Sequence, residues 1–199
     1  MKIGVISIQG DVSEHVVVLK KVLNDLGQNG EVITINKSGL VPYCDALVIP
    51  GGESTTLARL IARENIDKEI KDSAKNGIPI LGTCAGLILL SKHGDEQVKK
   101  TKQKLLGLMD IWVNRNAFGR QRESFEVLLD IPILGKEPFK AVFIRAPAIT
   151  HCSDNVEILA KYKKYIVAVK QDNILALAFH PELTEDLRFH HYFLDMVKV

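Results

Sequence analysis

One stretch, residues 79–90, restricts the folds open to this chain more than any other, because an apolar strand pattern gives way there to an apolar helix pattern. The change falls at Gly-Thr-Cys-Ala-Gly, where a glycine stands two residues before and two residues after Cys84. Such a turn reverses the chain without Cβ clashes and lifts the cysteine above the edge of a sheet. It also directs the first N–H groups of the helix toward whatever the sulfur attacks. The alternative is a structural cysteine buried after a strand.

The first half of the chain repeats a strand–helix pattern. Short apolar runs typical of strands occupy residues 2–7, 31–35 and 45–49. Helical patterns begin near Ser13 and near Ser54 or Thr55, where hydroxyl side chains favour a helix start, and a further helix is expected at residues 67–76. This alternation predicts an α/β fold: a three-layer sandwich with a mostly parallel central sheet and helices on both faces.

Beyond residue 104 the pattern changes to short runs rich in Val, Ile and Phe with little helix between them. These runs span residues 110–115, 124–130, 140–146, 156–162, 165–170 and 173–179. We expect additional antiparallel strands in this C-terminal half, a closing helix at residues 184–199, and an exposed loop or frayed helix at residues 93–104. No repeat and no linker interrupts the sequence, so residues 1–199 are expected to form a single domain.

Charge and cysteine content exclude several classes of protein. The formal net charge of the 199 residues is +2, which is too small to indicate a nucleic-acid or membrane partner. No apolar run approaches the roughly 20 residues that span a bilayer, and the N-terminal residues read as a strand, not a signal peptide. The three cysteines form no even disulfide framework and have no metal-ligand spacing, so we expect no metal and a reducing cytoplasm.

A nucleophilic cysteine needs a base, and His180 is the strongest candidate among the histidines. It ends an apolar run and is followed by Pro181 and Glu182. If the chain is extended here, residues 180 and 182 face the same way, so that the carboxylate orients the imidazole. Together with Cys84 this would make a Cys-His-Glu triad. The alternative is a solvated histidine and glutamate at the end of a strand.

A third loop, Pro-Gly-Gly-Glu-Ser at residues 50–54, follows an expected parallel strand. Two glycines allow backbone N–H groups to face an anion or a developing oxyanion. In α/β sheets, ligands bind at the carboxyl ends of the strands, where this loop would lie. The alternative is an ordinary β–α turn.

These three loops, in this order, resemble those of the class I glutamine amidotransferases. The likeness narrows to one branch, the PdxT/SNO family of glutaminase subunits of pyridoxal 5′-phosphate synthase, and it extends over essentially the whole chain. The segments that carry it are residues 50–56, 107–110, 115–121, 143–147 and 179–184. The segment Arg-Asn-Ala-Phe-Gly-Arg-Gln at residues 115–121 is the most specific to this branch.

The resemblance assigns a role to each of these residues. It implies that Cys84 attacks the side-chain amide of L-glutamine, that His180 transfers the protons, and that Glu182 orients His180. The N–H groups of Gly52 and Ala85 would form the oxyanion hole. The glutamine-binding positions would be Gly52, Glu53, Ser54, Arg115, Ile144 and Arg145. Without the motifs, the two arginines would be interpreted as members of surface ion pairs.

The resemblance further implies that the ammonia passes to a separate synthase subunit in a hetero-oligomer, with no cofactor bound by this chain. Glutaminase activity would stay low until that subunit binds, and a flip of the Gly51–Gly52 peptide is a physical cause that glycine permits. Three other functions remain open. They are a glutaminase of another pathway, such as histidine or anthranilate synthesis, a non-catalytic α/β module with an oxidation-prone cysteine, and a cysteine peptidase or thiol hydrolase.

Overall fold

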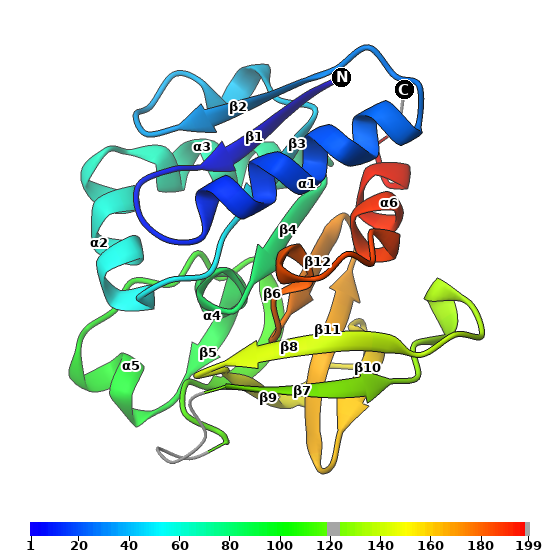
Figure 1. Ribbon diagram of the computed structural model, residues 1–199. Coiled ribbons are helices and arrows are strands. Elements are labelled where there is room, and N and C mark those ends of the chain that lie inside the picture. Colours follow the sequence, from blue (N-terminus) through cyan, green and yellow to red (C-terminus); the bar gives the residue numbers. More distant parts are fainter. Residues whose placement is uncertain (119–123, 198–199) are drawn as a thin grey trace.

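The computed structural model describes residues 1–118 and 124–197 (Figure 1). The strands are β1 (Lys2–Ile6), β2 (Glu31–Ile35), β3 (Ala46–Ile49), β4 (Ile80–Thr83), β5 (Ser91–Gly94), β6 (Met109–Asn114), β7 (Ser124–Leu129), β8 (Phe139–Ile144), β9 (Ala148–Cys152), β10 (Glu157–Tyr162), β11 (Tyr165–Gln171) and β12 (Ile174–Leu177). The helices are α1 (Val12–Asp25), α2 (Ser54–Arg63), α3 (Ile66–Lys75), α4 (Ala85–Leu90), α5 (Glu96–Lys100) and α6 (Arg188–Asp195). Short 3-10 turns are η1 (Val41–Tyr43), η2 (Pro132–Leu134) and η3 (Pro181–Leu183).

The main sheet has a parallel half and a half that is antiparallel apart from the parallel β5–β6 pair at its edge. Its strand order within the described residues is β2-β1-β3-β4-β12-β11-β9-β6-β5, with β10 paired to β11. Each neighbouring pair from β2 to β12 is parallel. Every residue of β3, β4 and β12 is buried, as expected for strands that helices cover on both faces. The carboxyl ends of these three strands therefore lie next to one another at one edge.

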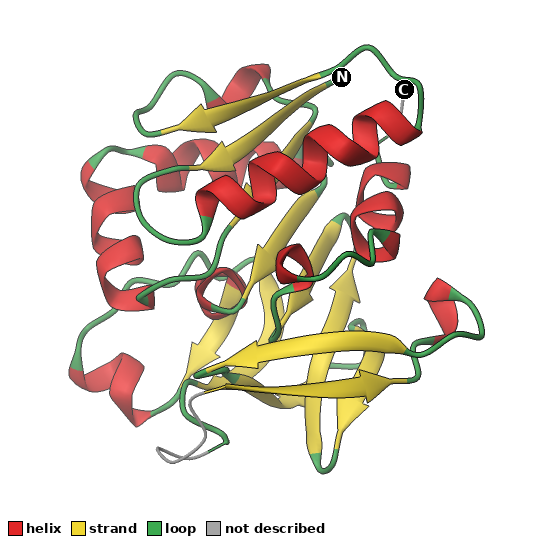
Figure 2. Ribbon diagram, in the orientation of Figure 1, coloured by secondary structure: helices red, strands yellow, loops and turns green. Residues whose placement is uncertain are grey.

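Helices form layers on the two faces of the parallel strands. Figure 1 shows α1 crossing in front of β1 and β3 with α6 beside it, while α3 lies behind the same strands. Helices α1 and α6 contact each other, and α2 packs against both α3 and α4. The colouring by secondary structure in Figure 2 separates this layered part from the strand-rich lower part of the molecule. The predicted α/β architecture with additional antiparallel strands is confirmed.

A separate hairpin, β7–β8, lies beside the end of β12. The backbone N–H of His180 donates to Val142 O of β8 at 2.8 Å, which ties the hairpin to the residues that follow β12. Buried phenyl rings complete the junction. Phe143 lies 5.5 Å from Phe179 between ring centroids, and Phe139 lies 4.8 Å from Phe189 of α6.

Several expected elements differ in the structure. The strand β9 was not predicted, because residues 148–152 mix apolar and polar side chains without a clear period. Residues 93–104, expected as a loop or frayed helix, contain the end of β5 and the capped helix α5. The closing helix is shorter than residues 184–199, since α6 begins only at Arg188.

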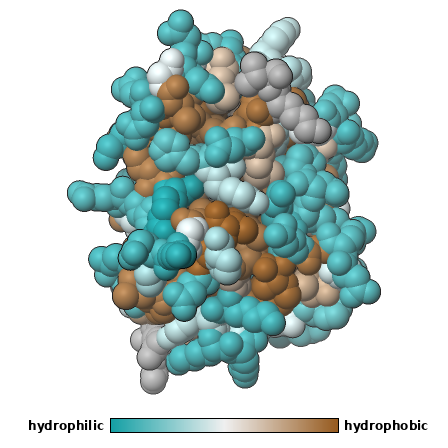
Figure 3. Space-filling model, turned by 90° about the vertical axis from the view of Figure 1, so that its right-hand side faces the viewer, coloured by the Kyte–Doolittle hydropathy of each residue, from teal (hydrophilic) through white to brown (hydrophobic). Residues whose placement is uncertain are grey.

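Apolar side chains also reach the surface. Figure 3 turns the right-hand side of Figure 1 toward the viewer and shows hydrophobic surface gathered in the middle of that side, with hydrophilic side chains around it. Within residues 1–118 and 124–197, no helix combines the length and the apolarity that crossing a bilayer requires.

Candidate active site

Cys84 lies between β4 and α4 in a backbone conformation that few non-glycine residues adopt, with φ 49° and ψ −100°. The turn is close enough that its two glycines accept no side chain. A Cβ atom on Gly82 would approach the carbonyl carbon of Gly86 to 2.8 Å, and one on Gly86 would collide with Ile49 O of β3. The Cys84 N–H donates to Leu177 O of β12 at 2.8 Å, so the turn is also fixed to the strand that leads to His180.

His180 and Glu182 are in direct contact and both are buried, at 2% and 4% exposure. His180 Nδ1 lies 2.7 Å from Glu182 Oε1. The expected extended conformation of residues 180–182 is wrong, because Pro181 opens the 3-10 turn η3, where its fixed φ fits the first position. The carboxylate reaches the imidazole around this turn instead of along a strand.

The charges of the site favour a protonated imidazole beside the sulfur. Burial opposes a charge on His180, but the contact with Cys84 and the hydrogen bond to Glu182 outweigh it and raise the pKa of His180 to about 10. Burial likewise acts to raise the pKa of Glu182, yet the hydrogen bond to His180 and the charge of that ring hold the pKa below its ordinary value. Glu182 is therefore ionised and holds the proton of His180 on the Nδ1 side.

Two further histidines lie behind Glu182 and are fully buried. His15 Nε2 is 3.4 Å from Glu182 Oε1 and 3.1 Å from Thr83 Oγ1. The ring of His190 lies 6.0 Å from that of His15, between centroids. Burial lowers the pKa of both, to about 3 for His190, so both are neutral at pH 7. Only the helical spacing of buried positions in α1 could have drawn attention to His15.

Asp11 is a site residue that the sequence did not indicate. It stands at the N-cap position of α1, where an aspartate commonly binds a backbone N–H, yet its side chain makes no such bond. Instead Asp11 Oδ2 lies 3.5 Å from His180 Nδ1. Asp11, His180 and Glu182 have ligand atoms within 4.8 Å of one another and are the candidate metal-binding group of the described residues. His180 Nδ1 and Glu182 Oε1 already bind each other, which fits proton transfer better than metal binding.

A cavity of about 260 Å³ opens beside Cys84 and His180 at the carboxyl ends of the parallel strands. Its lining comprises Asp11, Gly52, Glu53, Ser54, Cys84, Ile88, Arg115, Asn116, Ile144, Arg145 and His180. The structure therefore brings the predicted site residues together in the cavity lining, with two exceptions. Glu182 lies behind His180, and Ala85 is the buried first residue of α4. Gly119, Arg120 and Gln121 of the branch-specific segment lie outside the described residues.

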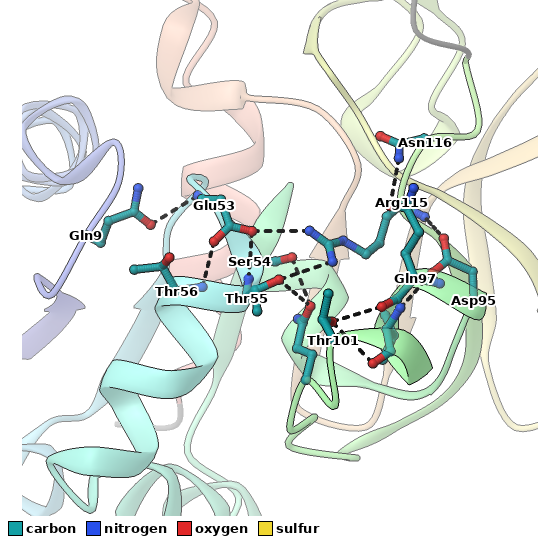
Figure 4. A network of polar contacts seen from close by, with 12 residues as sticks. Gln9, Glu53, Ser54, Thr55, Thr56, Asp95, Gln97, Thr101, Arg115 and Asn116 are labelled. Carbon is teal, nitrogen blue, oxygen red and sulfur yellow. Dashed lines mark hydrogen bonds and ion pairs between the residues drawn. The ribbon is translucent and has the colours of Figure 1, made fainter.

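Glu53 and Arg115 both line the cavity, and Figure 4 shows their side chains pointing toward each other. Glu53, and neither Ser54 nor Thr55, caps α2: its carboxylate accepts the N–H groups of Thr55 and Thr56 at 3.0 and 2.7 Å. Partial burial acts to raise the pKa of Glu53, but these hydrogen bonds lower it to about 2. Arg115 Nη2 pairs with Glu53 Oε1 at 3.2 Å. The ion pair left as an alternative for Arg115 thus exists, inside the cavity wall.

The loop of Gly51 and Gly52 packs tightly against the imidazole. A Cβ atom on Gly51 would lie 2.6 Å from Asp11 Oδ2 and would also meet the His180 ring. Gly52 has φ 140°, which a residue with a side chain rarely adopts. Arg145, which also lines the cavity, has φ 41° and is exposed, and the Cys84 sulfur lies 3.9 Å from Ile144 O.

Comparison with known sequences places the chain in a family. A model of the SNO glutamine amidotransferase family matches residues 5–199. The chain is 60% identical over 197 residues to "Pyridoxal 5′-phosphate synthase subunit PdxT" of Methanosarcina barkeri, a match covering 99% of this chain and 98% of the relative. The protein of the same name from Thermotoga maritima is 50% identical over 198 residues, with 100% of both chains covered.

Solved structures agree with the sequence relatives. One named "Crystal structure of glutamine amidotransferase" superposes with a TM-score of 0.86 at 42% identity, covering 99% of both chains. The structure of PurLQS from Thermotoga maritima superposes with a TM-score of 0.67 at 16% identity, which shows a shared fold alone. On the strength of the family match and of relatives identical at more than half of their positions, this chain belongs to the SNO glutamine amidotransferase family.

Proposed function

We propose that this chain hydrolyses L-glutamine to L-glutamate and ammonia through Cys84, His180 and Glu182. The observation that carries the proposal is the buried 2.7 Å contact between Glu182 and His180, with His180 and Cys84 lining the same cavity. A nucleophile, a base and a group that orients the base are the parts that covalent catalysis on an amide requires.

The reaction proceeds in two steps on this constellation. The Cys84 sulfur attacks the side-chain amide carbon of glutamine, and the N–H groups of Gly52 and Ala85 stabilise the oxyanion. His180 donates a proton to the leaving nitrogen, which departs as ammonia and leaves a glutamyl thioester. His180 then takes a proton from a water molecule that attacks the thioester carbon, the C–S bond breaks, and glutamate leaves the Cys84 sulfur beside the protonated His180. Glu182 holds the imidazole orientation throughout.

The remaining cavity residues fit the amino-acid end of the substrate. The guanidinium groups of Arg115 and Arg145 suit the α-carboxylate of glutamine, because a guanidinium forms two parallel hydrogen bonds with a carboxylate. Glu53, Ser54 and Ile144 complete the binding wall together with Gly52.

The ammonia acceptor in this proposal is a pyridoxal 5′-phosphate synthase subunit, in a hetero-oligomer. The printed name of the relatives, which are synthase subunits, supports it. Apolar surface bordered by polar side chains, as in Figure 3, is suited to a docked partner. All three cysteines are free thiols, in keeping with a reducing cytoplasm. Gly51 and Gly52 permit a peptide flip that would keep activity low without the partner; equal turnover with and without the synthase subunit would reject this regulation.

The experiment mixes the chain with a candidate synthase subunit, glutamine, a pentose 5-phosphate and glyceraldehyde 3-phosphate. We expect glutamate release and the absorbance of the pyridoxal product, both lost in Cys84→Ala. Unchanged glutamine hydrolysis by Cys84→Ala would favour a non-catalytic module. Co-purification with a synthase of histidine or anthranilate formation would transfer the function to that pathway. Peptide cleavage, without labelling of Cys84 by a glutamine analogue, would indicate a peptidase.

A further inference from the structure

The segment from Asp95 to Gln103 contains α5 and contacts the cavity lining at both of its ends. One end contacts Arg115 and the other contacts Ser54, and both of these residues are proposed to bind glutamine. The sequence suggested no role for this basic stretch. Figure 4 shows side chains of the segment pointing toward Arg115 and toward the start of α2. The contacts are made by uncharged amide groups and one carboxylate, and the lysines of the segment take no part in them.

Asp95 joins the start of α5 to the backbone of Arg115. Its Oδ1 accepts the N–H groups of Gln97 and Val98 at 3.0 and 3.1 Å, which caps α5. Its Oδ2 accepts the N–H of Arg115 at 2.7 Å. One carboxylate therefore fixes the position of Arg115 relative to a helix end. A second link runs from Asn116 Nδ2 to Gln97 Oε1 at 2.9 Å.

Gln103 supports the same arginine from the other end of the segment. Its side chain is 8% exposed, and its Oε1 accepts the hydroxyl protons of Ser54 and Thr55, both at 3.3 Å. Because the single hydroxyl proton of Thr55 is directed to Gln103, the lone pairs of that oxygen remain for Arg115 Nη1, which donates to it at 3.1 Å. The chain Gln103–Thr55–Arg115 thus has one consistent direction of donation.

We propose that Asp95 and Gln103 are positioning residues for glutamine binding, which hold the Arg115 guanidinium and the start of α2 in the orientation that receives the α-carboxylate. The inference rests on the proposed glutaminase function. Neither residue lines the cavity, so each acts through Arg115 or Thr55. A long side chain that is already fixed loses little further freedom when the substrate binds, and this favours affinity more than the chemical step.

The first test uses matched pairs of variants in the synthase complex. Thr55→Val removes the bridging hydroxyl and Thr55→Ser retains it. Asp95→Ala removes the carboxylate, and Asp95→Glu retains two acceptor oxygens, for the cap and for Arg115 N–H, on a side chain one methylene longer. We expect Thr55→Val and Asp95→Ala to raise the KM for glutamine about 5- to 10-fold, the equivalent of one lost hydrogen bond, with kcat within about 2-fold. The conservative member of each pair should restore the wild-type KM.

Gln103→Met, which has similar length but no acceptor, provides the second test. Its effect on KM should equal that of Thr55→Val, and the double variant should add nothing, because both break one chain of hydrogen bonds. Alkylation of Cys84 by iodoacetamide should keep the wild-type rate in every variant. Lys100→Ala is the control, since this exposed α5 side chain makes none of the contacts above. If Gln103→Met fails to fold, the Thr55 pair decides.

Two results would overturn the inference. One is an unchanged KM in both Thr55→Val and Asp95→Ala while the unaltered complex releases glutamate. The other is a fall of kcat and of the Cys84 alkylation rate by the same factor, which would indicate general disruption of the site. Calorimetry of glutamine binding to the Cys84→Ser chain distinguishes failure of the positioning role from failure of the proposed function. If that chain does not bind glutamine and the active complex does not hydrolyse it, the proposed function is rejected, and the positioning role with it.

Discussion

The backbone of Cys84 holds a conformation that costs about 1–3 kcal/mol for a residue with a side chain, so its neighbours must impose it. Gly86 is one of these neighbours, because its lack of a Cβ atom lets the start of α4 lie directly against Ile49 O of β3. We expect Gly86→Ala to push α4 from β3, to lower stability by about 1–3 kcal/mol, and to reduce kcat about 10²-fold through misplacement of the sulfur. Thermal melting and glutamate release measure the two effects.

The control for this variant is Gly27→Ala. Gly27 also has a positive φ, at 60°, but a Cβ atom there would meet no other atom within 4 Å. It should lower the melting temperature through backbone strain alone and leave glutamate release unchanged. Equal activity of Gly86→Ala and Gly27→Ala would contradict the role given to the turn.

Glu182 is expected to set both the orientation and the proton affinity of His180. In Glu182→Gln the imidazole loses its ionic partner, so the pKa of His180 should fall from about 10. Because this folded-state pKa lies above the ordinary 6.5, the protonated ring stabilises the fold fully below pH 6.5, and the contribution is lost as pH rises through about 10. NMR titration of the His180 ring measures the shift, and kcat should fall at least about 10²-fold. An unchanged titration would refute this account.

At the scale of elements, the β7–β8 hairpin is the support of His180. Phe143 is fully buried, stacks on Phe125 at 4.8 Å between centroids, and precedes the cavity residue Ile144. We expect Phe143→Ala to cost about 3–5 kcal/mol and to loosen the contact between β8 and the His180 backbone. Denaturant unfolding should show the loss of stability, and kcat should fall in protein that is still folded. Leu128→Ala, on the same hairpin but 69% exposed, should change neither.

The sequence alone predicts those parts of the site whose geometry depends on local turn residues. The glycines around Cys84, the proline after His180 and the glycine pair at residues 51–52 are local signals, and the structure brings these loops to one edge. The strand run at residues 173–179 was recognised, but no local pattern reveals that β12 pairs in parallel with β4. Such a pairing depends on packing between segments far apart in the chain.

The residues that the sequence did not indicate share a physical reason. Asp11 is placed by its approach to His180, His15 by its contact with Glu182, and Gln103 by two hydroxyl groups of α2. Each of these partners is far away in sequence, so neither spacing nor composition near the residue contains the signal. The 3-10 turn η3 is a different case, because a proline both favours an extended preceding residue and fits the first position of a turn, and Pro181 does the second.

At the scale of the whole molecule, the fold keeps neutral imidazoles in its interior, and this makes its stability depend on pH. His190 is fully buried, and burial lowers its pKa from 6.5 to about 3. Between those values the unfolded chain binds a proton that the folded chain excludes, so stability falls as the solution is acidified below pH 6.5. For this one residue the loss between pH 7 and pH 5 is about 2 kcal/mol. His15, whose pKa burial also lowers, acts in the same direction.

Replacement of His190 by leucine removes this proton-linked term while keeping an apolar side chain of similar size in α6. We expect His190→Leu to lose about 2 kcal/mol less stability than the wild-type chain between pH 7 and pH 5, measured by urea unfolding at each pH. Unfolding at pH 8, where an ordinary histidine is neutral in the unfolded chain too, gives the packing effect of the substitution separately. Parallel stability curves for the two proteins from pH 8 to pH 5 would show that His190 takes up its proton in the folded state.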